Sequence, residues 1–365
     1  MATSLNFAYL SRTKLIYYLG RRFNNITKLT KLHIRCSSNF NKMASSKVPN
    51  IQLSSGHEMP VVGYGTFNLF KENEVRDATG VALEVGYRHI DTAWVYKTEG
   101  EVGDAITSKI KDGTVKRSDL FITTKLWNTY HHPENVEEHC RDSLAKLQTD
   151  YLDLYLMHWP FAVAAEDKTA WILSESLKPS NIDYIDTWRA MEELVIKGLV
   201  KTIGVSNFNI QQLKRLLAAG NLRYKPAVNQ VEVHPYYTNS ELLDYCKQEN
   251  IVITAYSPLG KGGATYTSQQ LPNILVDDVV TKLAAKYNKS PAQVVLRWAI
   301  GRGYTVVPKS VTPSRIKDNL ELLDFALTED EIRAISDLDR NFKVVTLDKF
   351  KDYPEYPFTW LSTKK

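Results

Sequence analysis

The chain has 365 residues, of which 43% are hydrophobic and 24% charged, the composition of an ordinary globular protein. Its three cysteines are odd in number and share no CxxC spacing, which argues against a disulfide framework and indicates a reducing compartment. The net charge of +5 arises in residues 1–57, which hold nine Lys or Arg and no acidic residue; the remainder has 37 basic and 41 acidic residues, a net of −4. The body of the chain therefore offers no basic footprint for nucleic acid.

Residues 1–47 have the composition of an organelle transit peptide. They are rich in Arg and Lys, lack acidic residues and contain only apolar runs too short to span a membrane. The alternative is an upstream extension that is seldom translated, because Met43-Ala-Ser-Ser-Lys resembles a fresh start. We treat residues 1–47 as a leader, transit-peptide-like or disordered, and residues 48–365 as one domain. The expected location is the cytoplasm, or the mitochondrion if the leader acts as a transit peptide.

From residue 50 onward the pattern alternates between strands and helices, beginning with a hairpin at 51–60. Strands are predicted at 61–66, 89–93, 120–126, 152–159, 200–206, 227–233, 251–257 and 304–308. Helices are predicted at 74–85, 100–111, 134–148, 184–197, 209–219, 240–249, 275–288 and 314–323. Two further helices, at 290–302 and 328–338, are surplus to the repeat. The sequence therefore predicts one α/β domain, a single (β/α)8 TIM barrel with an N-terminal β-hairpin, two extra helices and an aromatic-rich C-terminal loop over its mouth.

Three predicted strands deliver polar residues that could carry chemistry. The first brings Asp91 and then Tyr96, the second ends at Lys125, and the third ends at His158. An Asp and a Tyr five residues apart could equally be a helix cap and a packed ring. However, a cation at the end of a buried strand is costly unless it is paired, and barrel active sites lie at the C-terminal ends of the strands. We therefore predict that these four residues form one constellation.

These motifs resemble the aldo-keto reductase family, in particular aldose reductase and aldehyde reductase-like members. Residues 86–93, Gly-Tyr-Arg-His-Ile-Asp-Thr-Ala, followed by Glu99 and Gly103, resemble the first family signature. The remaining motifs, in family order, are Gly204-Val-Ser-Asn-Phe208, Asn229-Gln230, Tyr256-Ser-Pro-Leu259 and Val307-Pro-Lys-Ser310 with Arg315 and Asn319. The resemblance covers roughly residues 48–365 and implies NADPH-dependent reduction of aldehydes and ketones to alcohols.

In this reaction Tyr96 is expected to be the general acid that protonates the alkoxide as it forms. Lys125 would lower the pKa of the phenol, and Asp91 would hold Lys125. His158 would hydrogen-bond the substrate carbonyl oxygen and orient it. The alternative from another class is a catalytically silent barrel that serves as a binding or structural protein.

No GxGxxG motif opens the first βα turn, so the dinucleotide must be held by other means. The resemblance implies that Ser206, Asn207 and Gln230 bind the carboxamide of the nicotinamide and that Tyr256 stacks on its ring. It also implies that Ser257 and Leu259 contact the pyrophosphate. At the other end it implies Lys309, Ser310 and Arg315 for the ribose 2′-phosphate and Asn319 for the adenine. A fork of cations suits a phosphate dianion, so NADPH is expected rather than NADH.

The substrate is expected to be a small-molecule carbonyl compound, bound in an aromatic pocket. The candidate pocket residues are Phe67, Trp94, Trp127 and Trp159. Phe67 stands where aldose-reducing members usually carry Trp, so sugars, steroids, lipid aldehydes and xenobiotic carbonyls all remain open. No metal site is expected, since His131 and His132 lie on a loop and His139 and Cys140 on a polar helix. We expect a monomer.

Overall fold

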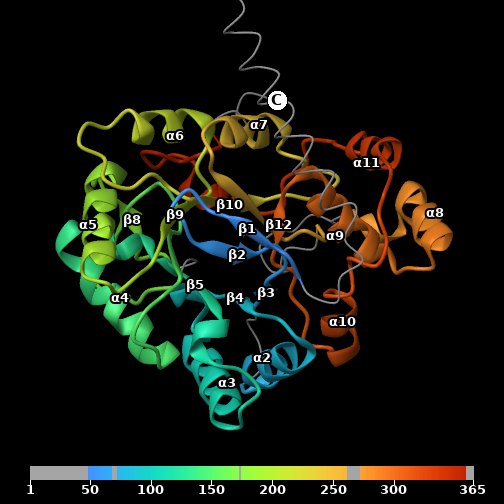
Figure 1. Cartoon of the computed structure of the whole chain (residues 1–365). Coiled ribbons are helices and arrows are strands. Elements are labelled where there is room, and N and C mark those ends of the chain that lie inside the picture. The colour runs from blue at the N-terminus through green and yellow to red at the C-terminus, as the bar shows by residue number, and fades with distance from the viewer. Residues whose placement is uncertain (1–47, 68–71, 172–173, 261–271, 359–365) are drawn as a thin grey trace, which may run out of the picture. The chain divides into compact units, whose positions relative to one another are not determined.

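The computed structural model describes residues 48–67, 72–171, 174–260 and 272–358. Its centre is a sheet of eight parallel strands that curls into a barrel (Figure 1). In sheet order the strands are β3 (Tyr64–Gly65), β4 (His89–Asp91), β5 (Phe121–Leu126), β6 (Leu154–Met157), β9 (Ile203–Ser206), β10 (Val228–Glu232), β11 (Val252–Tyr256) and β12 (Thr305–Val306). A parallel bridge between Val62 and Val306 joins the first strand to the last. The predicted (β/α)8 barrel is thereby confirmed.

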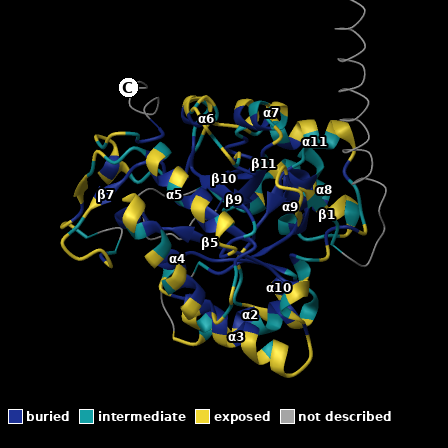
Figure 2. Cartoon of the chain, turned by 60° about the vertical axis from the view of Figure 1, so that its left-hand side comes forward, coloured by how far each residue is buried: buried dark blue, intermediate teal, exposed yellow. Residues whose placement is uncertain are grey.

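Helices surround this barrel and expose their outer faces, whereas the strands are buried (Figure 2). Those of the regular repeat are α2 (Glu74–Val85), α3 (Glu99–Lys111), α4 (Pro133–Leu147), α5 (Tyr184–Ile196), α6 (Ile210–Leu217), α7 (Ser240–Gln248), α9 (Pro291–Arg302) and α10 (Pro313–Asp318). The extra helices are α8 (Asp278–Tyr287) and α11 (Glu329–Ser336). We expected 290–302 to be surplus, but α9 buries every residue from Gln293 to Ile300, whereas α8 buries Val280 and Ala284. The helix that packs on the barrel is therefore α9, and α8 is the addition.

The predicted hairpin covers the N-terminal end of the barrel. Its strands, β1 (Asn50–Gln52) and β2 (Glu58–Pro60), pair in antiparallel register. Leu53 and Met59 are buried in one cluster with residues at the N-terminal ends of the strands, including Phe121 and Leu154. Apolar side chains of the hairpin therefore close this end of the barrel core.

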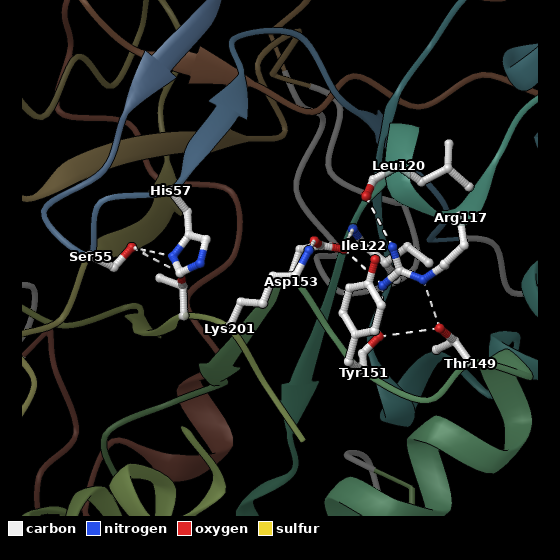
Figure 3. Close-up of polar contacts among 10 residues, drawn as sticks. Ser55, His57, Arg117, Leu120, Ile122, Thr149, Tyr151, Asp153 and Lys201 are labelled. Atoms are coloured by element: carbon white, nitrogen blue, oxygen red, sulfur yellow. Dashed lines mark hydrogen bonds and ion pairs between the residues drawn. The ribbon is translucent and has the colours of Figure 1, made fainter. Parts of the chain in front are cut away.

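A polar cluster on the same face holds neighbouring strands together (Figure 3). The buried Asp153 carboxylate accepts hydrogen bonds from Arg117 at 2.8 Å, Lys201 at 3.0 Å and the Ile122 amide at 3.0 Å. Arg117 lies over the ring of Tyr151 at 3.9 Å. These partners occupy both carboxylate oxygens of Asp153. The cluster therefore joins neighbouring strands at the end of the barrel opposite to the expected active site.

The C-terminal segment lies over the other end of the barrel, as predicted. Phe350 packs on Phe161 with ring centroids 5.1 Å apart, and Phe358 packs on Trp159 at 6.0 Å. Phe161 and Trp159 follow the C-terminal end of β6, so the segment forms a wall above the strand ends. Trp360, another aromatic residue of this segment, lies outside the described residues. Within the described parts of the chain, no helix is long and apolar enough to cross a membrane.

Gly103 allows α3 to approach α4 closely. A Cβ placed there would lie 2.9 Å from the Leu147 carbonyl carbon, closer than real Cβ contacts, whereas a Cβ at Gly100 in the same helix would meet nothing within 4 Å. We predict that Gly103→Ala lowers the free energy of unfolding by about 1–3 kcal/mol, because the helices must move apart. Gly100→Ala should change it by less than about 1 kcal/mol, toward greater stability. Urea denaturation of both variants checks this, and equal effects at the two positions would contradict it.

Candidate active site

The four predicted residues meet at the C-terminal ends of neighbouring strands. Asp91 ends β4, Tyr96 lies in the short 3-10 helix Trp94–Tyr96 that follows, Lys125 lies in β5, and His158 follows β6. Lys125 Nζ donates to Asp91 Oδ1 at 2.8 Å and to the Thr92 carbonyl oxygen at 2.7 Å. It also lies 5.3 Å from the centroid of the Tyr96 ring. The rings of Tyr96 and His158 are 6.0 Å apart, so one phenol and one imidazole border the same space.

Burial sets the charge states of the two basic groups. Lys125 is 1% exposed, and its burial lowers its pKa while the Asp91 carboxylate opposes that effect. Burial and the nearby Lys125 together hold the pKa of His158 well below its usual value. His158 is therefore a neutral imidazole, which can donate one hydrogen bond without bringing a charge to the site.

Tyr96 corrects one expectation. Desolvation raises the pKa of its phenol well above the usual value, and the Asp91 carboxylate raises it further. Lys125 does not outweigh these two effects, because its ammonium is shared with Asp91 and with the Thr92 carbonyl oxygen, so only part of its charge acts on the phenol. The predicted lowering of the Tyr96 pKa is therefore wrong, and the phenol is held protonated. Tyr96 is only partly buried, unlike Asp91 and Lys125.

The three residues expected at the nicotinamide carboxamide adjoin this constellation. Gln230 Nε2 donates to Asp91 Oδ2 at 2.6 Å, which occupies the second oxygen of that carboxylate. Asn207 Nδ2 donates to the His158 carbonyl oxygen at 3.0 Å and to Ser206 Oγ at 3.1 Å. The sequence analysis did not predict the hydrogen bonds of Gln230 to Asp91 and of Asn207 to His158. The first could have been inferred from Gln230 itself, a polar residue in a strand that is buried along its whole length.

Tyr256 lies at the end of β11, where a stacking ring was expected. Its hydroxyl donates to Asn207 Oδ1 at 2.8 Å. Asn207 and Ser257, each directly after a strand, have left-handed backbones with φ of 63° and 48°. Asn adopts the left-handed region at little cost, whereas this conformation is strained for Ser257. The structure thus brings Ser206, Asn207, Gln230 and Tyr256 together, with the partly buried Ser257 and Leu259 next along the chain.

The residues expected at the 2′-phosphate follow β12. Lys309 is exposed, and the Ser310 carbonyl oxygen accepts a hydrogen bond from the Tyr64 hydroxyl at 2.7 Å. Arg315 is exposed in α10 and forms no ion pair with another described residue, while Asn319 is buried directly after that helix. Two exposed cations and a buried amide within this stretch are a donor set that fits a nucleotide phosphate and its base.

Of the four expected pocket residues, the structure places two beside the reacting groups. Phe67 packs on Tyr96 at 4.9 Å between ring centroids, and Trp127 packs on His158 at 5.6 Å. Trp159 contacts the C-terminal wall through Phe358.

Trp94 does not join them. Its indole nitrogen donates to Asp142 on α4, and its ring packs on Tyr130 and on His139 of α4. This corrects its assignment to the pocket. The chain turns into the 3-10 helix directly after the strand, which directs Trp94 toward the surrounding helices.

Comparison with known proteins places the chain in a family. The sequence profile described as the Aldo/keto reductase family matches residues 61–340. The chain is 44% identical over 319 residues to aldo-keto reductase family 1 member A1-A of Danio rerio, covering 84% of this chain and 98% of that protein. It is 42% identical over 322 residues to estradiol 17 beta-dehydrogenase 5 of Mus musculus, covering 86% and 98%.

A solved structure agrees with this relationship. The crystal structure of Bombyx mori aldo-keto reductase in complex with NADP matches with a TM-score of 0.78 and 41% identity, covering 85% of this chain and 99% of that one. The chain belongs to the aldo/keto reductase family. It is accordingly a barrel oxidoreductase, which confirms the fold and the enzyme class expected from the sequence.

Proposed function

We propose that the protein reduces aldehydes and ketones to alcohols with NADPH, and that Tyr96 supplies the proton. The observation that carries this proposal is the buried Lys125–Asp91 pair beside Tyr96 and His158, all at the barrel end where active sites of this fold lie. The complex of the Bombyx mori relative with NADP supports the choice of cofactor. Loss of NADPH absorbance on addition of a carbonyl substrate tests the activity directly.

Tyr96 is the general acid. NADPH supplies a hydride when bound. An alkoxide is a stronger base than a phenolate, so a phenol that stays protonated can give its proton to the oxygen as charge develops there. Lys125 remains hydrogen-bonded to Asp91 and stabilises the negative charge left on the phenol from 5.3 Å below the ring.

His158 orients the substrate. Because its imidazole is neutral, one ring nitrogen donates to the carbonyl oxygen without competing with Tyr96 for the proton. The tie from Asn207 to the His158 carbonyl oxygen fixes the backbone that carries the ring. Phe67 and Trp127 enclose the reacting carbonyl with apolar surface and exclude water.

At the nicotinamide end, Ser206, Asn207 and Gln230 bind the carboxamide, and Tyr256 supports the ring. In the folded chain the Asn207 amide already holds Ser206 and Tyr256, so the group that receives the carboxamide is assembled in advance. Ser257 and Leu259 contact the pyrophosphate. The residues 261–271 that follow lie outside the described part of the chain.

Arg315 distinguishes NADPH from NADH. Together with Lys309 and Ser310 it binds the 2′-phosphate, and Asn319 binds the adenine. We predict that Arg315→Ala lowers the affinity for NADPH by about 10- to 100-fold, the effect of losing a charge-assisted hydrogen bond. The affinity for NADH should be nearly unchanged. Lys317→Ala, at an exposed lysine two residues further along α10, should change the affinity for neither cofactor. Quenching of tryptophan fluorescence measures each affinity, and equal losses for both cofactors at Arg315 would contradict the role.

A catalytically silent barrel is the alternative function. It would keep the cofactor site and fail to consume NADPH with any carbonyl compound. The relatives include proteins named estradiol 17 beta-dehydrogenase 5 and prostaglandin-E(2) 9-reductase, which supports a reductase acting on apolar carbonyl compounds.

We propose that the protein is a monomer located in the cytoplasm. Residues 1–47 would act as a leader, and residues 48–365 would form the catalytic domain. A fluorescent protein fused behind residues 1–47 should remain in the cytoplasm. Import into mitochondria would show that the leader is a transit peptide and would overturn the cytoplasmic assignment. The same fluorescent protein without the leader is the control.

A further inference from the structure

A second buried ion pair lies at the barrel mouth and takes no part in the chemistry described above. Glu232, the last residue of β10, is fully buried and accepts hydrogen bonds from His234 Nε2 at 2.9 Å and Lys343 Nζ at 3.3 Å. The amides of Val344 and Val345 donate to the same carboxylate at 2.6 and 2.8 Å. One carboxylate therefore fixes three consecutive residues at the start of the C-terminal segment.

The charges of this pair depend on each other. Burial alone would raise the pKa of Glu232, but Lys343, His234 and the Val344 amide lower it to about 2. The side chain of Lys343 is 2% exposed, and Glu232 opposes the lowering of its pKa by burial. Each group keeps its charge in a dry environment because the other is present, and breaking such a pair is costly.

The ammonium of Lys343 also joins two parts of the proposed active site. It lies 4.2 Å from the ring centroid of Phe358 in the C-terminal wall and 5.9 Å from that of Tyr256. Glu232 is the direct cross-strand partner of Tyr256 in the β10–β11 register. The ion pair thus stands between the ring proposed to support the nicotinamide and the aromatic wall that packs on Trp159.

We propose that Glu232 and Lys343 are a positioning pair that holds the C-terminal wall, residues 342–358, against Tyr256 and thereby determines binding of large apolar substrates. The inference rests on the proposed carbonyl reduction and deepens it. None of the described contacts of the pair is with Tyr96 or Lys125. The pair therefore affects the position of the C-terminal wall at the barrel mouth and does not affect the proposed proton transfer. Small carbonyl compounds, which do not reach the wall, should be insensitive to it.

Lys343→Met removes the charge and keeps an unbranched side chain that is one atom shorter. We expect it to raise the KM for a naphthaldehyde by about tenfold or more, with kcat for propanal changed by less than about threefold. Lys343→Arg retains a cation and should restore most of the affinity. Lys351→Met, at an exposed lysine in the same segment, should match wild type. An equal loss with both aldehydes, or no loss with either, would overturn the proposal.

Hydrogen exchange provides a readout that does not depend on activity. In Lys343→Met, the amides of residues 342–358 should exchange about tenfold faster than in wild type and in Lys351→Met, because the wall opens more often. Exchange in β5 and β6 should stay unchanged, which separates release of the wall from global loss of stability. If wild type reduces neither aldehyde, the proposed function fails while this measurement still decides whether the pair holds the wall. Unchanged exchange in residues 342–358 would overturn the pair's role.

Discussion

Tyr96→Phe should lose about 10²- to 10⁴-fold in kcat for carbonyl reduction and keep its affinity for NADPH, since it removes the proposed proton donor and leaves every proposed cofactor contact in place. The reason lies in the geometry: Tyr96 is the partly exposed hydroxyl-bearing ring beside both Lys125 and His158. Steady-state kinetics with NADPH and fluorescence titration of the cofactor measure the two quantities separately.

Tyr155→Phe is the matched control for that substitution. Tyr155, in β6, is fully buried, and its hydroxyl forms a hydrogen bond of 2.7 Å with His139 Nδ1 of α4 rather than facing the proposed site. Its loss should lower the free energy of unfolding by about 0.5–1.5 kcal/mol and leave kcat within about threefold of wild type. Near-normal turnover by Tyr96→Phe would remove Tyr96 as the acid, whatever the control shows.

Lys125→Met should be the most destabilising change at the site. Asp91 is 3% exposed, and without Lys125 the one side chain described as donating to its carboxylate is that of Gln230. A buried charge without its ion-pair partner should lower the free energy of unfolding by about 3–5 kcal/mol. Reduction should also fall by about 10²-fold or more, because the phenolate formed in the reaction loses its cation. Thermal unfolding and kinetics below the unfolding range measure both effects.

Two further variants identify the cause of the loss. Adding Asp91→Asn to Lys125→Met should recover part of the stability, since no unpaired charge then remains buried, but should not recover activity. Lys201→Met removes the ion pair with Asp153 at the opposite end of the barrel, where Lys201 is 40% exposed. It should cost less than about 1 kcal/mol. Equal destabilisation by Lys125→Met and Lys201→Met would contradict the account of the buried pair.

The sequence predicts most of this site because its residues share one rule of position. Asp91, Lys125, His158 and Ser206 each lie at or directly after the C-terminal end of a strand, and a closed parallel barrel brings all such ends to one rim. The prediction needs only the strand ends, and these follow from apolar runs interrupted by a polar residue.

The features that escaped prediction depend on packing between distant segments. Trp94 follows a strand end like the other pocket candidates, yet it turns outward to Asp142, a residue 48 positions later. Likewise, α9 and α8 have similar patterns, and only their contacts show which one covers the barrel. The four partners of Glu232 include residues more than 100 positions away, so spacing along the chain gave no sign of that pair.

The pKa of Tyr96 escaped prediction for an energetic reason. Proximity to a lysine suggested a lowered value, but desolvation of the ring and the charge of Asp91 act in the opposite direction. Only the hydrogen bonds from Lys125 to Asp91 and Thr92 show that the cation is shared, so that burial and Asp91 outweigh its effect on the pKa of the phenol. Tyr96, the proposed proton donor, is therefore a phenol that keeps its proton until negative charge develops on the substrate oxygen.

The central claim is that this barrel transfers hydride and proton to a carbonyl group. Its most direct test is to incubate the full chain with NADPH and a panel of aldehydes, ketosteroids and sugars while following NADPH absorbance, with Tyr96→Phe run in parallel. The account predicts substrate-dependent consumption of NADPH by wild type, formation of the matching alcohol, and almost none of either by the variant. Tight NADPH binding with no turnover of any carbonyl compound by wild type would contradict it and favour the silent barrel.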